Sequence, residues 1–176
     1  MSENADYQCA VKGMVPFVRQ KGETCWAAAI AMMHGWNNQM NCTMEQALSV
    51  AGNRIDGTPY KNLVKKGQKF PLVELGNLAL AMGMQHEEMR SFTAQQFFNL
   101  MCTSGSPMMV GFLYPGGSIA HFCVVTEMWS DDGLVSVRMN DPNEANEGTE
   151  VFFDGLYQNM ERLTNWASVK MQILHY

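Results

Sequence analysis

The sequence predicts an α+β fold, with helices in the first part of the chain and an antiparallel sheet in the second. Two patterns predict this division. Up to about residue 104 the apolar residues recur at helical spacing, whereas from residue 107 onward they alternate with polar residues between turn sequences. The chain has 176 residues, of which 47% are hydrophobic, enough for one core. We therefore expect a single domain, 1–176, with a helical lobe at about 20–104 and a sheet lobe at about 105–176.

The first predicted helix begins at Cys25. Thr24 before it is a good N-cap residue, because its hydroxyl can accept a hydrogen bond from a free first-turn N–H. Residues 27–33 leave the helix almost no polar face, so we expect it to run through the core. Gly35 is the expected C-terminal cap. Such a helix would hold the cysteine at its tip rigidly.

Further helices carry their own start signals. Thr43 is followed three residues later by Gln46, a capping-box pattern, and this helix should stop at Gly52. Thr93 is the expected cap of another helix. The lysine-containing segment 57–69 is expected to be a loop with one helical turn. The helices predicted after the first are 43–51, 73–82, 94–101 and 154–163.

Strands are predicted for most of the chain after residue 107, where β-branched and aromatic residues are frequent. Turn-forming residues at 115–118 and 130–133 separate the first three strands, which favours antiparallel hairpins. Residues 1–19 are expected to form an irregular arm with one short strand at 14–18. The strands predicted in the second part are 107–114, 119–129, 134–140, 150–153 and 167–174.

Charge and hydropathy argue against several classes of protein. The net charge of −5 and the pI of about 5.3 disfavour a nucleic-acid-binding protein, which normally has a basic face. Residues 1–7 have neither the basic nor the apolar region of a signal peptide, and no apolar run is long enough to span a membrane. We therefore expect a protein that is cytoplasmic as synthesised, or secreted by a signal-peptide-independent route, with no nucleic-acid or membrane partner. It could also be one domain of a longer polypeptide.

The cysteine pattern favours reduced thiols. Five cysteines are an odd number, and no C-x-x-C pair occurs among them, which is a poor framework for disulfides and for a zinc site. We therefore expect free thiols, no metal and no cofactor. The cysteines are Cys9, Cys25, Cys42, Cys102 and Cys123.

Cys25 is the candidate nucleophile. Free N–H groups and the helix dipole in the first turn of a helix favour a thiolate there, and the thiolate is the form that attacks. A buried, inert core cysteine is the competing interpretation. The neighbouring Trp26, and Gln20 five residues upstream, favour the catalytic interpretation.

A base and an orienting group occur in the sheet part. His121 lies early in an apolar strand, and Asp141 lies where the next strand ends, so a tight turn between the strands can bring them side by side. An imidazole can take a proton from the thiol and later protonate the leaving group, while a carboxylate orients the imidazole. A side-chain amide such as that of Gln20, with the Cys25 backbone N–H, can stabilise an oxyanion. The competing interpretations are a core histidine and a turn aspartate.

With these residues in this order, the chain resembles the papain-like cysteine peptidases, and most of all their compact bacterial branches, the C39-like and AvrRpt2-like (C70) peptidases. Gln20 precedes Thr24-Cys25-Trp26-Ala27-Ala28 at a helix start, His121 begins an apolar strand, and Asn140-Asp141-Pro142 follows the next strand. The resemblance covers roughly residues 14–145 in layout. It implies a papain-like fold, in which the nucleophile helix packs on a C-terminal antiparallel sheet.

The resemblance also implies a role for each residue. Cys25 would be the nucleophile, His121 the general base and acid, Asp141 the residue that orients His121, and Gln20 part of the oxyanion hole. Larger papain relatives carry an asparagine at the orienting position, so Asp141 points to the compact branches, and the adjacent Asn140 is the alternative. Only 24 residues precede Cys25, so no inhibitory pro-segment is expected.

Two tryptophans are candidates for lining a substrate cleft. Trp26 follows the candidate nucleophile, and Trp129 lies at the end of the strand that begins near His121. Core packing is the competing interpretation for both indoles.

The predicted function is a cysteine peptidase that hydrolyses a protein or peptide bond through a Cys-His-Asp triad and a thioester acyl-enzyme. The same triad could serve an amidase, a deamidase or an acyl transferase, and a papain-like scaffold could also be a non-enzymatic binding domain. The resemblance suggests a bacterial effector or toxin domain with a protein or peptide substrate. An effector aimed at competing bacteria would imply a cognate inhibitor, or immunity protein, in the producer.

Overall fold

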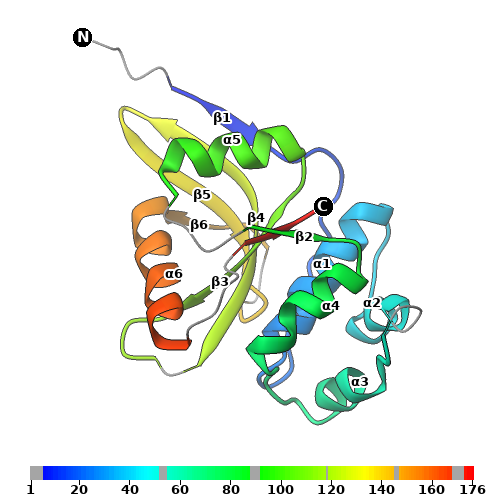
Figure 1. Cartoon of the computed structure of the whole chain (residues 1–176). Coiled ribbons are helices and arrows are strands. Elements are labelled where there is room, and N and C mark those ends of the chain that lie inside the picture. The colour runs from blue at the N-terminus through cyan, green and yellow to red at the C-terminus, as the bar shows by residue number, and fades with distance from the viewer. Residues whose placement is uncertain (1–5, 52–54, 88–91, 118, 145–146, 168–172) are drawn as a thin grey trace.

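A computed structural model describes residues 6–51, 55–87, 92–117, 119–144, 147–167 and 173–176, without the side chains of 164–167. It has the α+β fold that the sequence predicts, with helices first and an antiparallel sheet second (Figure 1). The helices are α1 (Cys25–Asn38), α2 (Met44–Ala51), α3 (Thr58–Lys65), the short 3₁₀ helix η1 (Leu72–Glu74), α4 (Leu75–Ala81), α5 (Ala94–Ser104) and α6 (Phe153–Ala167).

Seven strands form one sheet in the order β2-β7-β3-β4-β5-β6, all antiparallel, and β1 pairs with the far end of β4. In Figure 1 the helices α1–α4 gather on one side of this sheet, and α5 and α6 lie against its other side. The strands are β1 (Gln8–Ala10), β2 (Gln85–His86), β3 (Met108–Leu113), β4 (Ala120–Asp131), β5 (Leu134–Asn140), β6 (Thr149–Phe152) and β7 (Ile173–His175).

Two predicted segments in the first part of the chain were wrong. The N-terminal strand is β1, not 14–18, because Gln8–Ala10 pairs with β4 whereas Pro16 has no N–H to give to a ladder. The segment predicted as a loop with one turn contains the two-turn helix α3, which has Pro59 in its first turn, where a missing N–H costs nothing. The predicted strand 167–174 begins later, at β7, and residues 168–172 lie outside the described part.

Helix α1 is the buried centre of the helical part, as its sequence predicts. It continues past Gly35 and ends at Asn38, where Gln39 takes the left-handed conformation with φ 50°. Gly35 has a different use. A Cβ there would lie 2.4 Å from Cγ of Pro16 and 2.7 Å from the Met40 carbonyl oxygen, so the glycine lets the N-terminal arm pass close to the helix.

The other helix starts follow their local signals. At α2 the hydroxyl of Thr43 accepts from the N–H of Gln46, whose side chain accepts from the N–H of Thr43, so the capping box is confirmed. At α5, Thr93 forms the same arrangement with Gln96. The predicted stop of α2 at Gly52 lies outside the described residues.

Two large clusters of buried side chains form most of the core in the described part of the chain. One joins α1, α2 and α4 to the sheet through residues such as Ile30, Leu48, Leu78 and Val124. The other joins α5 and α6 to β3, β4 and β5 and contains Phe97. The sheet is therefore covered by both groups of helices, which fixes the start of β4 against α1.

Cys9 and Cys102 form a disulfide that links β1 to α5. The expectation that all five cysteines are reduced thiols was therefore wrong for this pair. The remaining cysteines, Cys25, Cys42 and Cys123, are free and buried. A bond across 93 positions of sequence could not be predicted from the local pattern, because the spacing of the cysteines carries no signal for it.

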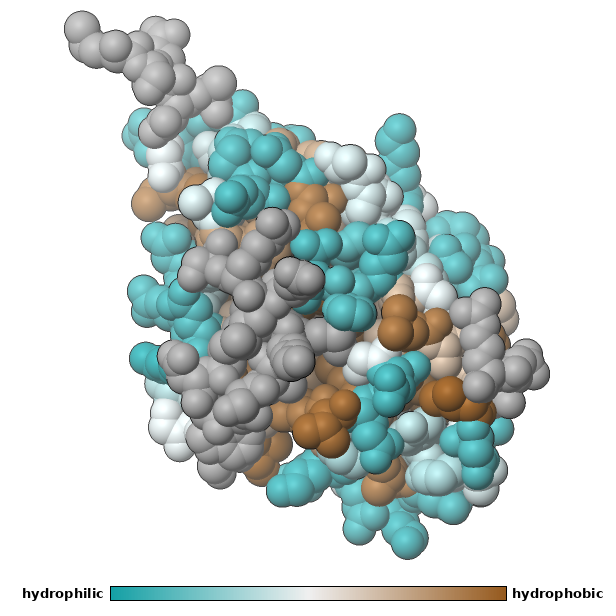
Figure 2. All heavy atoms as spheres, viewed as in Figure 1, coloured by the Kyte–Doolittle hydropathy of each residue, from teal (hydrophilic) through white to brown (hydrophobic). Residues whose placement is uncertain are grey.

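The visible surface is largely hydrophilic (Figure 2). Hydrophobic atoms reach it over η1 and α4, where Val73 is 88% exposed and Leu80 52%. Single apolar side chains of this kind are ordinary on a protein surface. Within the described part of the chain, every helix is too short or too polar to cross a bilayer.

Candidate active site

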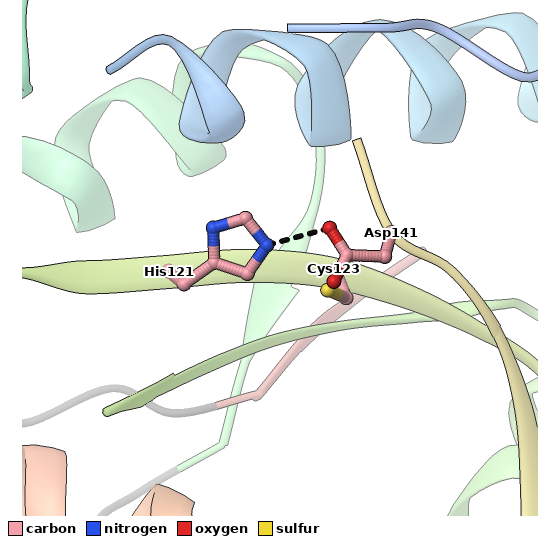
Figure 3. A group of neighbouring side chains, drawn as sticks. All are labelled: His121, Cys123 and Asp141. Carbon is pink, nitrogen blue, oxygen red and sulfur yellow. Dashed lines mark hydrogen bonds and ion pairs between the residues drawn. The ribbon is translucent and has the colours of Figure 1, made fainter. Parts of the chain in front are cut away.

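The turn between β4 and β5 brings His121 and Asp141 together. His121 is the second residue of β4, and Asp141 follows the last residue of β5, its antiparallel neighbour. His121 Nε2 lies 2.7 Å from Asp141 Oδ1, and both side chains are buried (Figure 3). An ionised carboxylate can only accept, so Nε2 carries the hydrogen and Nδ1 is the ring nitrogen left for another partner. In Figure 3, Nδ1 lies on the side of the ring that faces α1.

Burial and three hydrogen-bond donors act in opposite directions on the pKa of Asp141. Burial alone raises the pKa of this carboxyl, but hydrogen bonds from His121, from the Asn143 backbone N–H and from the Tyr114 hydroxyl outweigh it and hold the pKa below its usual value. The Asn143 N–H lies 2.8 Å from Oδ1, and the Tyr114 hydroxyl lies 3.0 Å from Oδ2. Asp141 is therefore a carboxylate at neutral pH.

Cys25 reaches the same place from the helical part. It is the first residue of α1 and is 5% exposed, and its Sγ lies 3.9 Å from the carbonyl oxygen of Ala120, the residue before His121. Burial lowers the pKa of His121, but its hydrogen bonds with Asp141 and Cys25, and their negative charges, raise it to about 9. The imidazole is thus protonated at neutral pH, between a carboxylate and a sulfur.

The start of α1 departs from its predicted cap. The Thr24 hydroxyl makes no hydrogen bond to the first turn and instead accepts from the Lys21 N–H at 2.9 Å and donates to the Lys21 carbonyl at 3.0 Å. Thr24 thus closes the loop before the helix. Among the described residues, no acceptor is found for the backbone N–H of Cys25. This group remains free to bind a negatively charged atom beside the sulfur.

Gln20 lies in that loop and is fixed to the opposite side of the site. Its backbone N–H donates to the Pro142 carbonyl at 2.9 Å, which ties the loop before Cys25 to the residue after Asp141. Its side-chain Nε2 donates to the Gly22 carbonyl at 2.8 Å, and its Oε1 is buried without a hydrogen-bond partner in the described part. One amide hydrogen on Nε2 remains after the bond to Gly22.

Asn140, the alternative to Asp141, has a different partner. Its Oδ1 accepts from the Gly148 backbone N–H at 3.1 Å. Successive side chains of a strand point to opposite faces, so Asn140 and Asp141 cannot both face His121. Of these two neighbours, the structure pairs Asp141 with the imidazole.

Cys123 is also close to the pair (Figure 3). Its Sγ, His121 and Asp141 offer ligand atoms that all lie within 4.8 Å of one another, a composition that can hold a metal ion. Burial, with the nearby charge of Asp141, raises the pKa of the Cys123 thiol well above its usual value, and the side chain is fully buried. A neutral, inaccessible thiol is a poor nucleophile, so of the two sulfurs near His121 only Cys25 suits an attack.

The two tryptophans lie in different surroundings. Trp26 is buried, donates from its indole to the Gln68 carbonyl at 3.2 Å, and packs on Phe70. Trp129 lies eight residues beyond His121 on β4, about 26 Å away at 3.3 Å per residue, where it contacts Arg138. Their place in a substrate cleft stays a prediction.

Tyr114 is a residue of the site that was not predicted from the sequence. It follows β3, and its ring lies 5.5 Å from the imidazole of His121 while its hydroxyl binds Asp141. The signal for it was available, because the turn sequence at 115–118 makes β3 and β4 a hairpin, and residues just before that turn must lie beside the start of β4.

Comparisons with known proteins identify the family and the fold of the chain. A family model described as papain-like cysteine protease AvrRpt2 matches residues 7–157. Among solved structures, a C39-like peptidase from Bacillus anthracis superposes with a TM-score of 0.54 over 95% of this chain and 96% of its own, at 15% sequence identity. At that identity the likeness shows a shared fold alone. Comparison with curated proteins gives no match.

Proposed function

Since the chain belongs to the AvrRpt2 family of papain-like cysteine proteases, we propose that it cleaves peptide bonds with Cys25 as the nucleophile. In this proposal His121 is the general base and acid, and Asp141 holds the imidazole in place. The observation that carries the proposal is the buried His121–Asp141 pair, with the ring's other nitrogen on the side of the helix that begins with Cys25. The protein is papain-like in fold and catalytic class, and its substrate is a protein or peptide.

The first half of the proposed reaction forms an acyl-enzyme. The Cys25 sulfur attacks the carbonyl carbon of the scissile bond, and the carbonyl electron pair moves onto oxygen as the C–S bond forms. When the oxyanion collapses, the C–N bond breaks and the amine leaves with the proton from His121. A thioester on Cys25 and a neutral His121 result.

The second half hydrolyses the thioester. Water gives its proton to His121 and its oxygen attacks the acyl carbon, after which the C–S bond breaks and the sulfur leaves as a thiolate beside the imidazolium. Asp141 stays ionised in both halves and keeps the proton on Nε2, so that Nδ1 exchanges the proton that moves. No metal or cofactor takes part in the proposed steps.

The backbone N–H of Cys25 and the side-chain amide of Gln20 are the proposed oxyanion hole. The free N–H at the start of α1 and the remaining hydrogen on Gln20 Nε2 support this assignment. The bond from Nε2 to Gly22 fixes the amide before substrate arrives, and preorganised donors of this kind stabilise the charge that develops on the oxygen.

We also propose a biological role as a bacterial effector or toxin domain that acts on a protein or peptide in a target cell after signal-peptide-independent export. Family membership supports this role. If the target is a competing bacterium, the producing cell needs a cognate inhibitor, or immunity protein, that covers the site.

The test compares the wild-type protein with Cys25→Ala on a cell lysate, with new peptide N-termini mapped by mass spectrometry. We expect specific cleavages with the wild type, and a loss of at least about a thousandfold in the variant, because the nucleophile is gone. Cys42→Ala is the matched control, since the hydrogen bonds of this buried thiol go to the backbone of Thr43 and Ala47, and the variant should leave the cleavages unchanged.

A second measurement separates the proposed chemistry from its alternatives. Near pH 6, iodoacetamide should modify Cys25, the proposed nucleophile, faster than Cys42 and Cys123, because burial raises the pKa of the other two thiols. Fast labelling with ammonia release but no new N-termini would indicate an amidase or deamidase. Equally slow labelling of all three would favour a binding domain and contradict the proposal.

A further inference from the structure

We propose that Tyr114 is a positioning residue for the reaction: its hydroxyl fixes the carboxylate of Asp141, and through it the imidazole of His121. The inference rests on the proposed function and adds a residue outside the triad. The Tyr114 hydroxyl donates to Asp141 Oδ2 at 3.0 Å, which is the oxygen that His121 does not use.

The two carboxylate oxygens of Asp141 have different donors. Oδ1 accepts from His121 Nε2 at 2.7 Å and from the Asn143 backbone N–H at 2.8 Å. A carboxylate held at one oxygen can still turn about its Cβ–Cγ bond, which changes the direction of the lone pairs that meet the imidazole. The hydroxyl on Oδ2 removes this freedom, because both oxygens then have fixed partners.

Tyr114 is itself held in place by the hairpin turn. Its carbonyl accepts from the Gly117 N–H at 2.9 Å, and Pro115 and Gly116, with φ +74°, are suited to the two central positions of such a turn. Its ring packs edge-on against Phe112, with centroids 5.1 Å apart, and lies 5.5 Å from the His121 ring. The phenol therefore covers the imidazole while its hydroxyl reaches the carboxylate.

The charges suit this role. Burial and the charge of Asp141 raise the pKa of Tyr114 far above its usual value, so the phenol is protonated and can donate at neutral pH. The pKa of Asp141 is held low in spite of burial, so its carboxylate stays an acceptor. The hydrogen bond thus has a fixed direction, from tyrosine to aspartate.

The experiment is a double-mutant cycle on a peptide that the wild-type protein cleaves. Tyr114→Phe keeps the ring and removes the donor. We expect kcat to fall about tenfold with KM within about twofold, because a hydrogen bond to a charged group is lost without loss of a substrate contact. In an Asp141→Asn background, Tyr114→Phe should have almost no further effect, since the carboxylate through which it acts is gone.

A spectroscopic measurement needs no substrate. The proton on His121 Nε2, shared with a carboxylate at 2.7 Å, should give a far-downfield proton resonance that shifts or broadens in Tyr114→Phe. The matched control is Tyr60→Phe, which removes a tyrosine–carboxylate bond of 3.1 Å to Glu74 in the helical part, and it should leave both kcat and this resonance unchanged. Thermal unfolding of each variant confirms that it is folded.

The outcomes are distinct. A wild-type protein that cleaves its peptide through Cys25, with an unchanged kcat and resonance in Tyr114→Phe, overturns the positioning role alone. A change in KM with constant kcat, or equal effects of Tyr114→Phe in both backgrounds, also overturns it, because Tyr114 would then act on substrate or independently of Asp141. Activity that survives Cys25→Ala instead overturns the proposed function.

Discussion

The imidazole of His121 lies beside the carboxylate of Asp141 and the sulfur of Cys25, in a place that water hardly reaches. A lone cation there would be costly, because burial penalises charge. The hydrogen bonds with both neighbours outweigh that cost and move the pKa of His121 from 6.5 to about 9. A protonated imidazole at neutral pH is what the proposed thiolate needs beside it.

This raised pKa makes the stability of the protein depend on pH. The folded protein holds the His121 proton more tightly than the unfolded chain does, so the stabilisation is fully present below pH 6.5 and is lost as the pH rises through about 9. We expect the free energy of unfolding in urea to fall by about 3 kcal/mol across this window, at 1.36 kcal/mol per pKa unit.

The control for this prediction is Asp141→Asn, which removes the strongest of the interactions that raise the pKa of His121. Its free energy of unfolding should change much less over the same pH range. An equally steep fall in this variant would assign the pH dependence to other groups.

The sequence predicts part of this residue-scale picture. His121 and Asp141 could be paired in advance, because a hairpin turn fixes which residues of two strands are neighbours. The partner of the Thr24 hydroxyl could not be predicted from the sequence. Lys21 offers both a donor and an acceptor that compete with the helix N–H groups, and only the path of the loop decides between them.

At the scale of secondary-structure elements, the position of the sulfur depends on how α1 is enclosed. The helix is buried along almost its whole length, and its close contact with the N-terminal arm is possible because Gly35 has no side chain. The arm carries Gln20 to the start of the same helix, so the packing at Gly35 and the geometry at Cys25 belong to one segment.

Gly35→Ala tests this packing. The added methyl would meet the ring of Pro16 and the backbone carbonyl of Met40, and backbone cannot move as easily as a flexible side chain. We expect a loss of about 1–3 kcal/mol in the free energy of unfolding, although alanine favours the helix.

The matched control is Gly155→Ala in α6, where a Cβ would meet nothing within 4 Å. Only the higher helix propensity of alanine then acts, and the free energy of unfolding in urea should rise by about 0.5–1 kcal/mol. A Gly35→Ala protein as stable as the wild type would contradict this prediction, because it would show that the N-terminal arm can move to accommodate the methyl group.

Element prediction succeeds where the signal is local. The capping box at Thr43, the cap at Thr93 and the turns of the long hairpins were predicted from residues within a few positions of one another. Strands β1 and β2 could not be predicted, because each has two or three residues and exists through its pairing with β4 or β7. Their sequences alone have too little alternation to distinguish a strand from a loop.

At the scale of the whole molecule, contacts repeatedly cross the predicted division near residue 104. Strand β2 pairs with β7 at the C-terminal end of the chain, and β1 pairs with β4. These crossings support our proposal that 1–176 is one domain, with a helical lobe at about 20–104 and a sheet lobe at about 105–176. We expect both lobes to unfold together.

The Cys9–Cys102 disulfide joins β1 to α5, and Cys102→Ser tests its contribution to stability. Loss of a bond that closes so long a loop should lower the free energy of unfolding by about 2–4 kcal/mol, because the unfolded chain gains conformational freedom. Differential scanning calorimetry with and without dithiothreitol measures the effect.

The reductant serves as the control. It should lower the melting temperature of the wild type to that of Cys102→Ser and leave the variant unchanged. A wild type that melts at the same temperature in both buffers would contradict the stabilising role.

The pairing of β1 with β4 joins Gln8 to Glu127, which are 119 residues apart. During translation, α1 therefore leaves the ribosome long before the strands that complete its surroundings, and folding has to wait for these distant partners. A nascent chain that ends before residue 121 presents the cysteine without the imidazole, and one that ends before residue 141 lacks the carboxylate that orients it. In our proposal, order of synthesis thus keeps the enzyme silent inside the cell that makes it until the last part of the catalytic group has emerged.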